Sequence, residues 1–122
     1  MSIFYIFAGN NGSGKSSFRQ QALDGFYSEV VMYYLLVSDV KLNINRVKYR
    51  HQQGGHFIPT EDIIRRHKRS RDNLLKIKNE IDQLFIIDNS QRESHLIATL
   101  EKGTIIYTDD NYTDLLQSNL KL

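Results

Sequence analysis

The residues best suited to chemistry stand in the segment G-N-N-G-S-G-K-S, which runs from Gly9 to Ser16. It matches the phosphate-loop pattern G-x-x-x-x-G-K-[ST] at every required position. Gly9 and Gly14 allow backbone angles that a side chain would forbid, so successive N–H groups can point at phosphate oxygens. Lys15 would bridge the β- and γ-phosphates, and the Ser16 hydroxyl would ligate Mg²⁺. The segment predicts a site for ATP or GTP; a glycine-rich turn that binds nothing is the alternative.

The elements around this segment have the order that a phosphate loop requires. Residues 3–8 form an apolar run that is typical of a strand buried on both faces, and residues 15–23 have helix-forming composition. The expected nucleotide-binding residues are Gly9, Asn11, Gly12, Ser13, Gly14, Lys15, Ser16 and Ser17, and Ser16 is also the expected metal ligand.

A second candidate is the basic segment Arg65–Arg71, R-R-H-K-R-S-R, on an expected helix. It lies in residues 41–76, where ten Lys and Arg stand against three carboxylates, a net charge of +7. One interpretation is a lid in which Arg65 and Arg66 reach the transferred phosphate. A solvated helix face and a nucleic-acid surface are the alternatives. The nucleic-acid surface ranks last, because no aromatic stacking pattern accompanies the arginines.

Asp88 and His56 are two further residues whose position in the sequence suggests a role. Asp88 ends the apolar run L-F-I-I-D, where it could orient Mg²⁺ or could begin a turn whose D-N-S segment caps the next helix. His56 lies in G-G-H-F-I-P and is expected to organise that turn by hydrogen bonds. The four histidines show no metal-ligand spacing.

Apolar periodicity divides the remaining chain into alternating strands and helices. The expected strands are 3–8, 30–37, 84–88 and 104–107, and the expected helices are 15–23, 38–54, 60–83, 90–100 and 111–120. Ser38 is the expected N-cap of the second helix, and Ser90 with Glu93 forms the capping box of the fourth. This alternation predicts an α/β fold with a mostly parallel sheet.

Size and composition fit one globular domain over residues 1–122. There is no cysteine, which excludes disulfides and thiolate metal sites. No signal peptide or apolar run of membrane-spanning length is present in the sequence, so we expect a cytoplasmic protein without a membrane partner.

Residues 44–74 resemble one segment of the zeta-toxin-like P-loop kinases. That family's pattern is an R-V-x-x-R helix, then G-G-H-x-I/V-P, then a helix that begins I-x-R-R and continues to R-S-x-x-N-L. The matching residues are Arg46, Val47, Arg50, Gly54, Gly55, His56, Ile58, Pro59, Arg65, Arg66, Arg69, Ser70, Asn73 and Leu74. Residues 86–90 and 104–107 match the family's closing stretch, so the resemblance covers nearly the whole chain.

The resemblance implies a P-loop NTPase-like three-layer fold and transfer of phosphate from ATP or GTP to a UDP-activated amino sugar. It gives catalytic roles to Lys15, Arg65 and Arg66, and it implies a UDP-sugar-like acceptor. An antitoxin-like partner or self-association is a further expectation. Nucleic acid is not an expected partner.

The chain also departs from the family pattern between Leu23 and the strand that begins near Val30. The family has there a strand with an N-A-D-like motif, whose aspartate is the expected base, and an F-x-x-E-T-T-like strand for the acceptor. Asp24 and Glu29 are the only carboxylates in this joint, and neither has the motif context. The sheet is therefore expected to be truncated, with an exposed edge that closes up or is filled by a partner chain. A nucleotide-binding module deficient in catalysis is the alternative function, with a basic nucleic-acid-interaction protein last.

Overall fold

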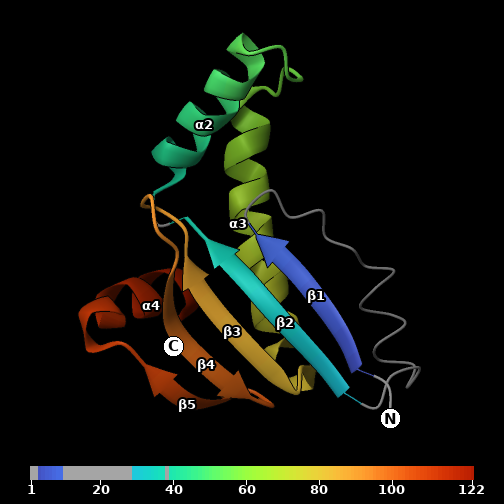
Figure 1. Cartoon of the computed structure of the whole chain (residues 1–122), viewed down its shortest axis with the longest axis vertical. Coiled ribbons are helices and arrows are strands. Elements are labelled where there is room, and N and C mark those ends of the chain that lie inside the picture. The colour runs from blue at the N-terminus through green and yellow to red at the C-terminus, as the bar shows by residue number, and fades with distance from the viewer. Residues whose placement is uncertain (1–2, 10–28, 38) are drawn as a thin grey trace.

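The computed structural model of the chain describes residues 3–9, 29–37 and 39–122 (Figure 1). Its elements are β1 (Ile3–Gly9), β2 (Glu29–Leu36), α2 (Val40–Gln52), α3 (Thr60–Ile77), the short 3₁₀ helix η1 (Lys78–Glu80), β3 (Gln83–Asp88), β4 (His95–Glu101), β5 (Thr104–Thr108), the 3₁₀ helix η2 (Asp110–Tyr112) and α4 (Thr113–Leu120). The phosphate loop expected after Gly9, the helix expected over 15–23 and the N-cap expected at Ser38 all fall outside the described residues.

One five-stranded sheet, in the order β1-β2-β3-β4-β5, forms the centre of the fold. β1, β2 and β3 run parallel to one another, whereas β4 and β5 run antiparallel to their neighbours. The predicted α/β class is confirmed, and the sheet is mixed, with its parallel part confined to the first three strands.

The helix predicted over residues 90–100 is wrong, because residues 95–101 form strand β4. β4 and β5 are joined by a two-residue turn at Lys102 and Gly103, whose φ angles of 50° and 82° are typical of a type I′ hairpin. Ser90 does not open a helix, because its backbone N–H and its hydroxyl both donate to Oδ1 of Asp88, at 3.0 and 2.5 Å. The apparent capping box is therefore part of a turn after β3.

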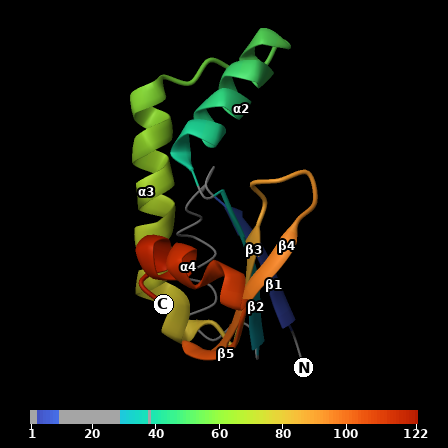
Figure 2. The same cartoon turned by 90° about the vertical axis from the view of Figure 1, so that its left-hand side faces the viewer.

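Helices α3 and α4 both pack against one face of the sheet, as Figure 2 shows. The buried side of α3 carries Ile63, His67, Ser70 and Leu74, a spacing that places them on one helical face. The core between helices and sheet is formed by Val30, Met32, Tyr34, Leu36, Leu74, Ile81, Leu84, Ile86, Ile97, Ala98, Leu100, Leu116 and Leu120. In the described residues the fold thus has two layers, a sheet and one layer of helices.

Helices α2 and α3 form a hairpin that extends past the ends of the strands (Figures 1 and 2). Asp39 caps α2 by accepting a 2.9 Å hydrogen bond from the N–H of Lys41. After α2, Gly54 has a φ of +96°, and the N–H of Gly55 donates to the carbonyl of Arg50 at 2.8 Å. α3 ends at Ile77 and is followed by η1, so it is shorter than predicted.

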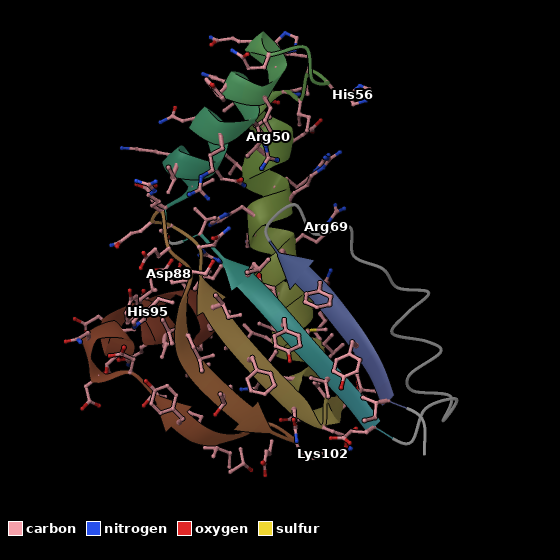
Figure 3. All side chains as sticks on the ribbon, viewed as in Figure 1. Arg50, His56, Arg69, Asp88, His95 and Lys102 are labelled. Atoms are coloured by element: carbon pink, nitrogen blue, oxygen red, sulfur yellow. The ribbon has the colours of Figure 1, made fainter. Side chains whose placement is uncertain are left out.

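The imidazole that bonds to this turn belongs to His51, whose Nδ1 lies 3.2 Å from the carbonyl oxygen of Gly55. The ring of His51 also makes an edge contact with Phe57. His56, to which the sequence assigned this role, is exposed at the tip of the hairpin (Figure 3). The G-G-H segment therefore serves the geometry of the turn through its glycines rather than through His56.

Candidate functional site

The carboxyl ends of β1, β2 and β3 meet at one edge of the sheet, because the three strands are parallel. Gly9 is the last residue of β1 and the first residue of the phosphate-loop motif. Gly9 pairs with Leu35 of β2, and on the other side of β2 its neighbour Leu36 pairs with Asp88. The motif therefore begins at the strand ends where parallel α/β sheets commonly bind ligands.

Helix α3 is fastened to the end of β1 by a short hydrogen-bond relay. The hydroxyl of Ser70 donates to the carbonyl oxygen of Gly9 at 2.9 Å, and the Tyr34 hydroxyl lies 2.8 Å from the same Ser70 oxygen. Because the one proton of Ser70 points at Gly9, Tyr34 is the donor of the second bond. Burial raises the pKa of Tyr34, so its hydroxyl stays protonated as this donor role requires. The relay holds the last residue of β1 against α3 and β2.

Gly9 has a packing reason to be glycine as well as a chemical one. A Cβ at this position would lie 3.1 Å from the carbonyl oxygen of Leu35 on the neighbouring strand. Such a contact is tighter than van der Waals packing allows without movement of β2. Strand packing thus favours a glycine at the first position of the motif, apart from any role in phosphate binding.

The basic segment of α3 separates into exposed and buried side chains. Arg65 is exposed and forms a 2.8 Å ion pair with Asp62, three residues earlier on the same helix. Arg66 and Arg69 are exposed, and Arg69 precedes the Ser70 that contacts Gly9, which places it beside the end of β1 (Figure 3). Arg66 and Arg69 are three residues apart, so their side chains leave neighbouring positions on the helix. Both can face a ligand at this edge.

Arg71 and His67 instead belong to the interior. The guanidinium of Arg71 donates to the carbonyl oxygen of Val37 at 2.8 Å and to the side-chain oxygen of Asn119, and burial lowers its pKa. His67 is buried, and its pKa is lowered to about 4, first by burial and then by the neighbouring charge of Arg71. His67 is therefore neutral at pH 7. Arg71 thus joins α3 to the residue after β2 and to α4, whereas Nδ1 of His67 is buried without a hydrogen-bond partner among the described residues.

Asp88 is buried at the end of β3 and is already bonded to Ser90. The turn that it forms is also tied to α2, because Arg46 donates to the carbonyl oxygen of Ser90 at 3.3 Å. Within the described ranges, no group of three or more His, Asp or Glu side chains could hold a metal ion. The contacts of Asp88 agree with the turn interpretation, although the element that follows is β4 and not a helix.

The structure brings together Gly9, which the sequence predicts as a site residue, with Ser70 and Tyr34, to which the sequence assigned no role in the site. Arg65 and Arg66 lie on the exposed part of α3, whereas Asn11, Gly12, Ser13, Gly14, Lys15, Ser16 and Ser17 lie outside the described residues. Sequence reasoning missed the relay through Ser70. The available signal was its position, since a serine at the 63, 67, 70, 74 spacing occupies the buried face of the helix.

Comparisons with protein-family models, with curated proteins and with solved structures find no match to this chain. In the part of the chain that the structure describes, no helix combines the length and the apolar character needed to cross a bilayer.

Proposed function

We propose that this protein binds the magnesium complex of ATP or GTP at the carboxyl end of β1. One observation carries the proposal: the complete motif G-x-x-x-x-G-K-S starts at Gly9, and Gly9 ends a strand of the parallel part of the sheet. A phosphate loop requires this position, because its N–H groups must open toward the ligand beyond the strand end.

The charges around this strand end fit a triphosphate. Arg69 immediately precedes Ser70, which holds Gly9, and Arg66 lies about one helical turn earlier; both are exposed, and no ion pair of either arginine is found among the described residues. Lys15 would contact the β- and γ-phosphates, and Ser16 would hold Mg²⁺, which neutralises phosphate charge. Ser70 and Tyr34 would position the start of the loop from behind.

Phosphate transfer to a UDP-activated amino sugar is the second candidate, and it rests on the resemblance to the zeta-toxin-like kinases. The geometry of Glu29 bears on it, because Glu29 pairs with Ile3 at the opposite end of β1 from Gly9. Seven strand residues separate the two ends by about 20 Å. Glu29 is therefore too far from the phosphates to act as the base, which favours nucleotide binding without efficient transfer.

Isothermal titration with Mg-ATP and Mg-GTP tests nucleotide binding. The Lys15→Ala variant should lose most of the affinity, whereas Lys48→Ala removes an exposed lysine from α2 and serves as the matched control. A control variant that loses as much affinity as Lys15→Ala would show non-specific attraction to the basic segment. No binding of either nucleotide at millimolar concentration would overturn the proposal.

A transfer assay separates the two candidates. The protein is incubated with labelled Mg-ATP or Mg-GTP and a UDP-activated amino sugar, and the phosphorylated sugar is measured beside a Lys15→Ala sample. Binding without product above that control supports the non-catalytic module. Lys15-dependent product would establish the kinase instead.

A further inference from the structure

β1 is the outer strand of the described sheet, and its own residues carry none of the features that usually protect a sheet edge. All seven of its residues pair in regular register with β2, so the strand contains no bulge. Its sequence I-F-Y-I-F-A-G has no charge and no proline. Among the described strands, none pairs with the other side of β1. Such an edge presents backbone donors and acceptors to any chain that can pair with them.

Exposed aromatic side chains also favour association at this edge. Phe7, Tyr33 and Phe85 form a row across three strands, with ring centroids 5.1 and 5.0 Å apart and interplanar angles of 11° and 14°. The rings stand face to face, so no further ring can insert between them. Phe7 ends the row on the outer strand and is 74% exposed, and Tyr5 on the same face is 54% exposed. The stack can therefore grow only outward, past Phe7.

The opposite edge of the sheet is built differently. β5 carries a bulge, because Thr99 pairs with Tyr107 and Leu100 with Ile105, which leaves Ile106 as the extra residue. The charged Lys102 lies in the turn that begins this strand. A bulge twists an edge away from continuous pairing. The two edges are thus not equivalent, and β1 is the one suited to strand pairing.

We propose that two copies of this chain associate through antiparallel pairing of β1 with β1, which joins both sheets into one. A twofold axis at Ile6, the midpoint of Ile3–Gly9, is the register that pairs every residue of the strand. Phe7 then faces Tyr5 of the second copy, and Tyr5 faces its Phe7. Each aromatic row gains a ring at its open end.

A second copy fits this edge better than an arbitrary extended peptide because β1 is complementary to itself. Antiparallel pairing places no charges against each other, and the exposed aromatics of one copy meet those of the other. The proposal does not depend on nucleotide binding, so either one can fail without the other.

Sedimentation equilibrium across a dilution series tests the association. We expect a reversible dimer of twice the 14.3 kDa chain mass. Phe7→Lys places a charge in the interface and should give the monomer mass, whereas Ile106→Lys places the same charge on the exposed bulge of β5 and should leave the dimer intact. A monomer at every concentration of the unaltered protein would overturn the proposal, as would equal effects of the two variants.

Cross-linking tests the register and does not rely on Phe7→Lys folding. The chain contains no cysteine, so Tyr5→Cys and Phe7→Cys each introduce a single thiol. Under oxidation, a mixture of the two variants should form a mixed disulfide dimer faster than either variant alone. Residue 5 faces residue 7 of the second copy only when the axis passes through Ile6. Cross-links no faster in the mixture than in the separate variants would contradict the proposed pairing.

Discussion

The hydroxyl of Ser70 donates a 2.9 Å hydrogen bond to the carbonyl oxygen of Gly9, across 61 positions of the sequence. Gly9 ends the first strand and opens the phosphate-loop motif, while Ser70 lies within the long helix α3. The same serine accepts from Tyr34, so one small side chain connects β1, β2 and α3. The first residue of the motif is therefore held by a helix that follows it much later in the chain.

Replacing Ser70 by Ala should leave the hydroxyl of Tyr34 and the carbonyl of Gly9 without a partner. An unsatisfied buried polar group costs about 1–3 kcal/mol, so we expect a loss of unfolding free energy in that range. Urea denaturation measures it, and Ser94→Ala, which removes an exposed hydroxyl, is the control. Nucleotide affinity should fall in Ser70→Ala alone. Equal stability of the two variants would contradict the structural role of the relay.

His67 should make the stability of the protein depend on pH between about 6.5 and 4. The folded state keeps the ring neutral until its pKa of about 4, whereas the unfolded chain takes up a proton near the ordinary 6.5. The unfolded state thus binds more protons in this window, and the free energy of unfolding falls as pH falls. The contribution of the neutral His67 to stability is therefore fully present above pH 6.5.

His67→Leu should flatten this slope, as urea denaturation at several pH values would measure. Asp82 contributes in a lower window, because its hydrogen bond with Lys102 and that from the N–H of Val30 lower its pKa below 3.8. Its contribution is therefore lost at more acidic pH, and it should be unchanged in the variant. A slope between pH 6.5 and 4 that persists in His67→Leu would refute the assignment.

Arg66 should matter more than Arg65 for nucleotide affinity. Arg65 is paired with Asp62 at 2.8 Å, so it must give up that partner to reach a phosphate. A hydrogen bond to a charged group contributes about 1.5–3 kcal/mol, which corresponds to a roughly tenfold or greater loss for Arg66→Ala. Arg65→Ala should have a smaller effect by calorimetry. The reverse order would show that Asp62 releases Arg65 when nucleotide binds.

Gly54→Ala should destabilise the hairpin of α2 and α3. The φ of +96° at Gly54 is one that residues with a side chain rarely adopt, and the left-handed region costs such a residue roughly 1–2 kcal/mol. Gln53→Ala, at the neighbouring position with a φ of −89°, is the matched control. Thermal unfolding followed by circular dichroism should show a lower midpoint for Gly54→Ala alone.

Much of the fold is readable from local patterns. The apolar runs at residues 3–8 and 30–37 and the periodic stretch after Thr60 predict β1, β2 and α3, because burial on a sheet and on a helix face produce different spacings. β4 was missed because two local signals compete. S-Q-R-E has the letters of a capping box, but the K-G turn at 102–103 and the neighbouring Asp88 decide in favour of a hairpin.

Only the local part of the candidate site can be predicted from the sequence in this way. The sequence pattern of a phosphate loop is local, so its match at Gly9–Ser16 can be found without a structure. The partner of Ser70 cannot be, since it depends on which strand α3 crosses. The pairing of Arg65 with Asp62 has the i, i+3 spacing of a helix and could have been anticipated.

The two helices of the hairpin differ in how much of their surface is buried, and so in how well their amide hydrogens are protected from exchange. α2 buries only Asn43 and Val47, whereas α3 buries four residues along one face. Amide hydrogens of α2 should therefore exchange with solvent through a partial opening that leaves the sheet closed. Those of β2 and β3, whose side chains fill the core, should exchange only when the whole domain unfolds.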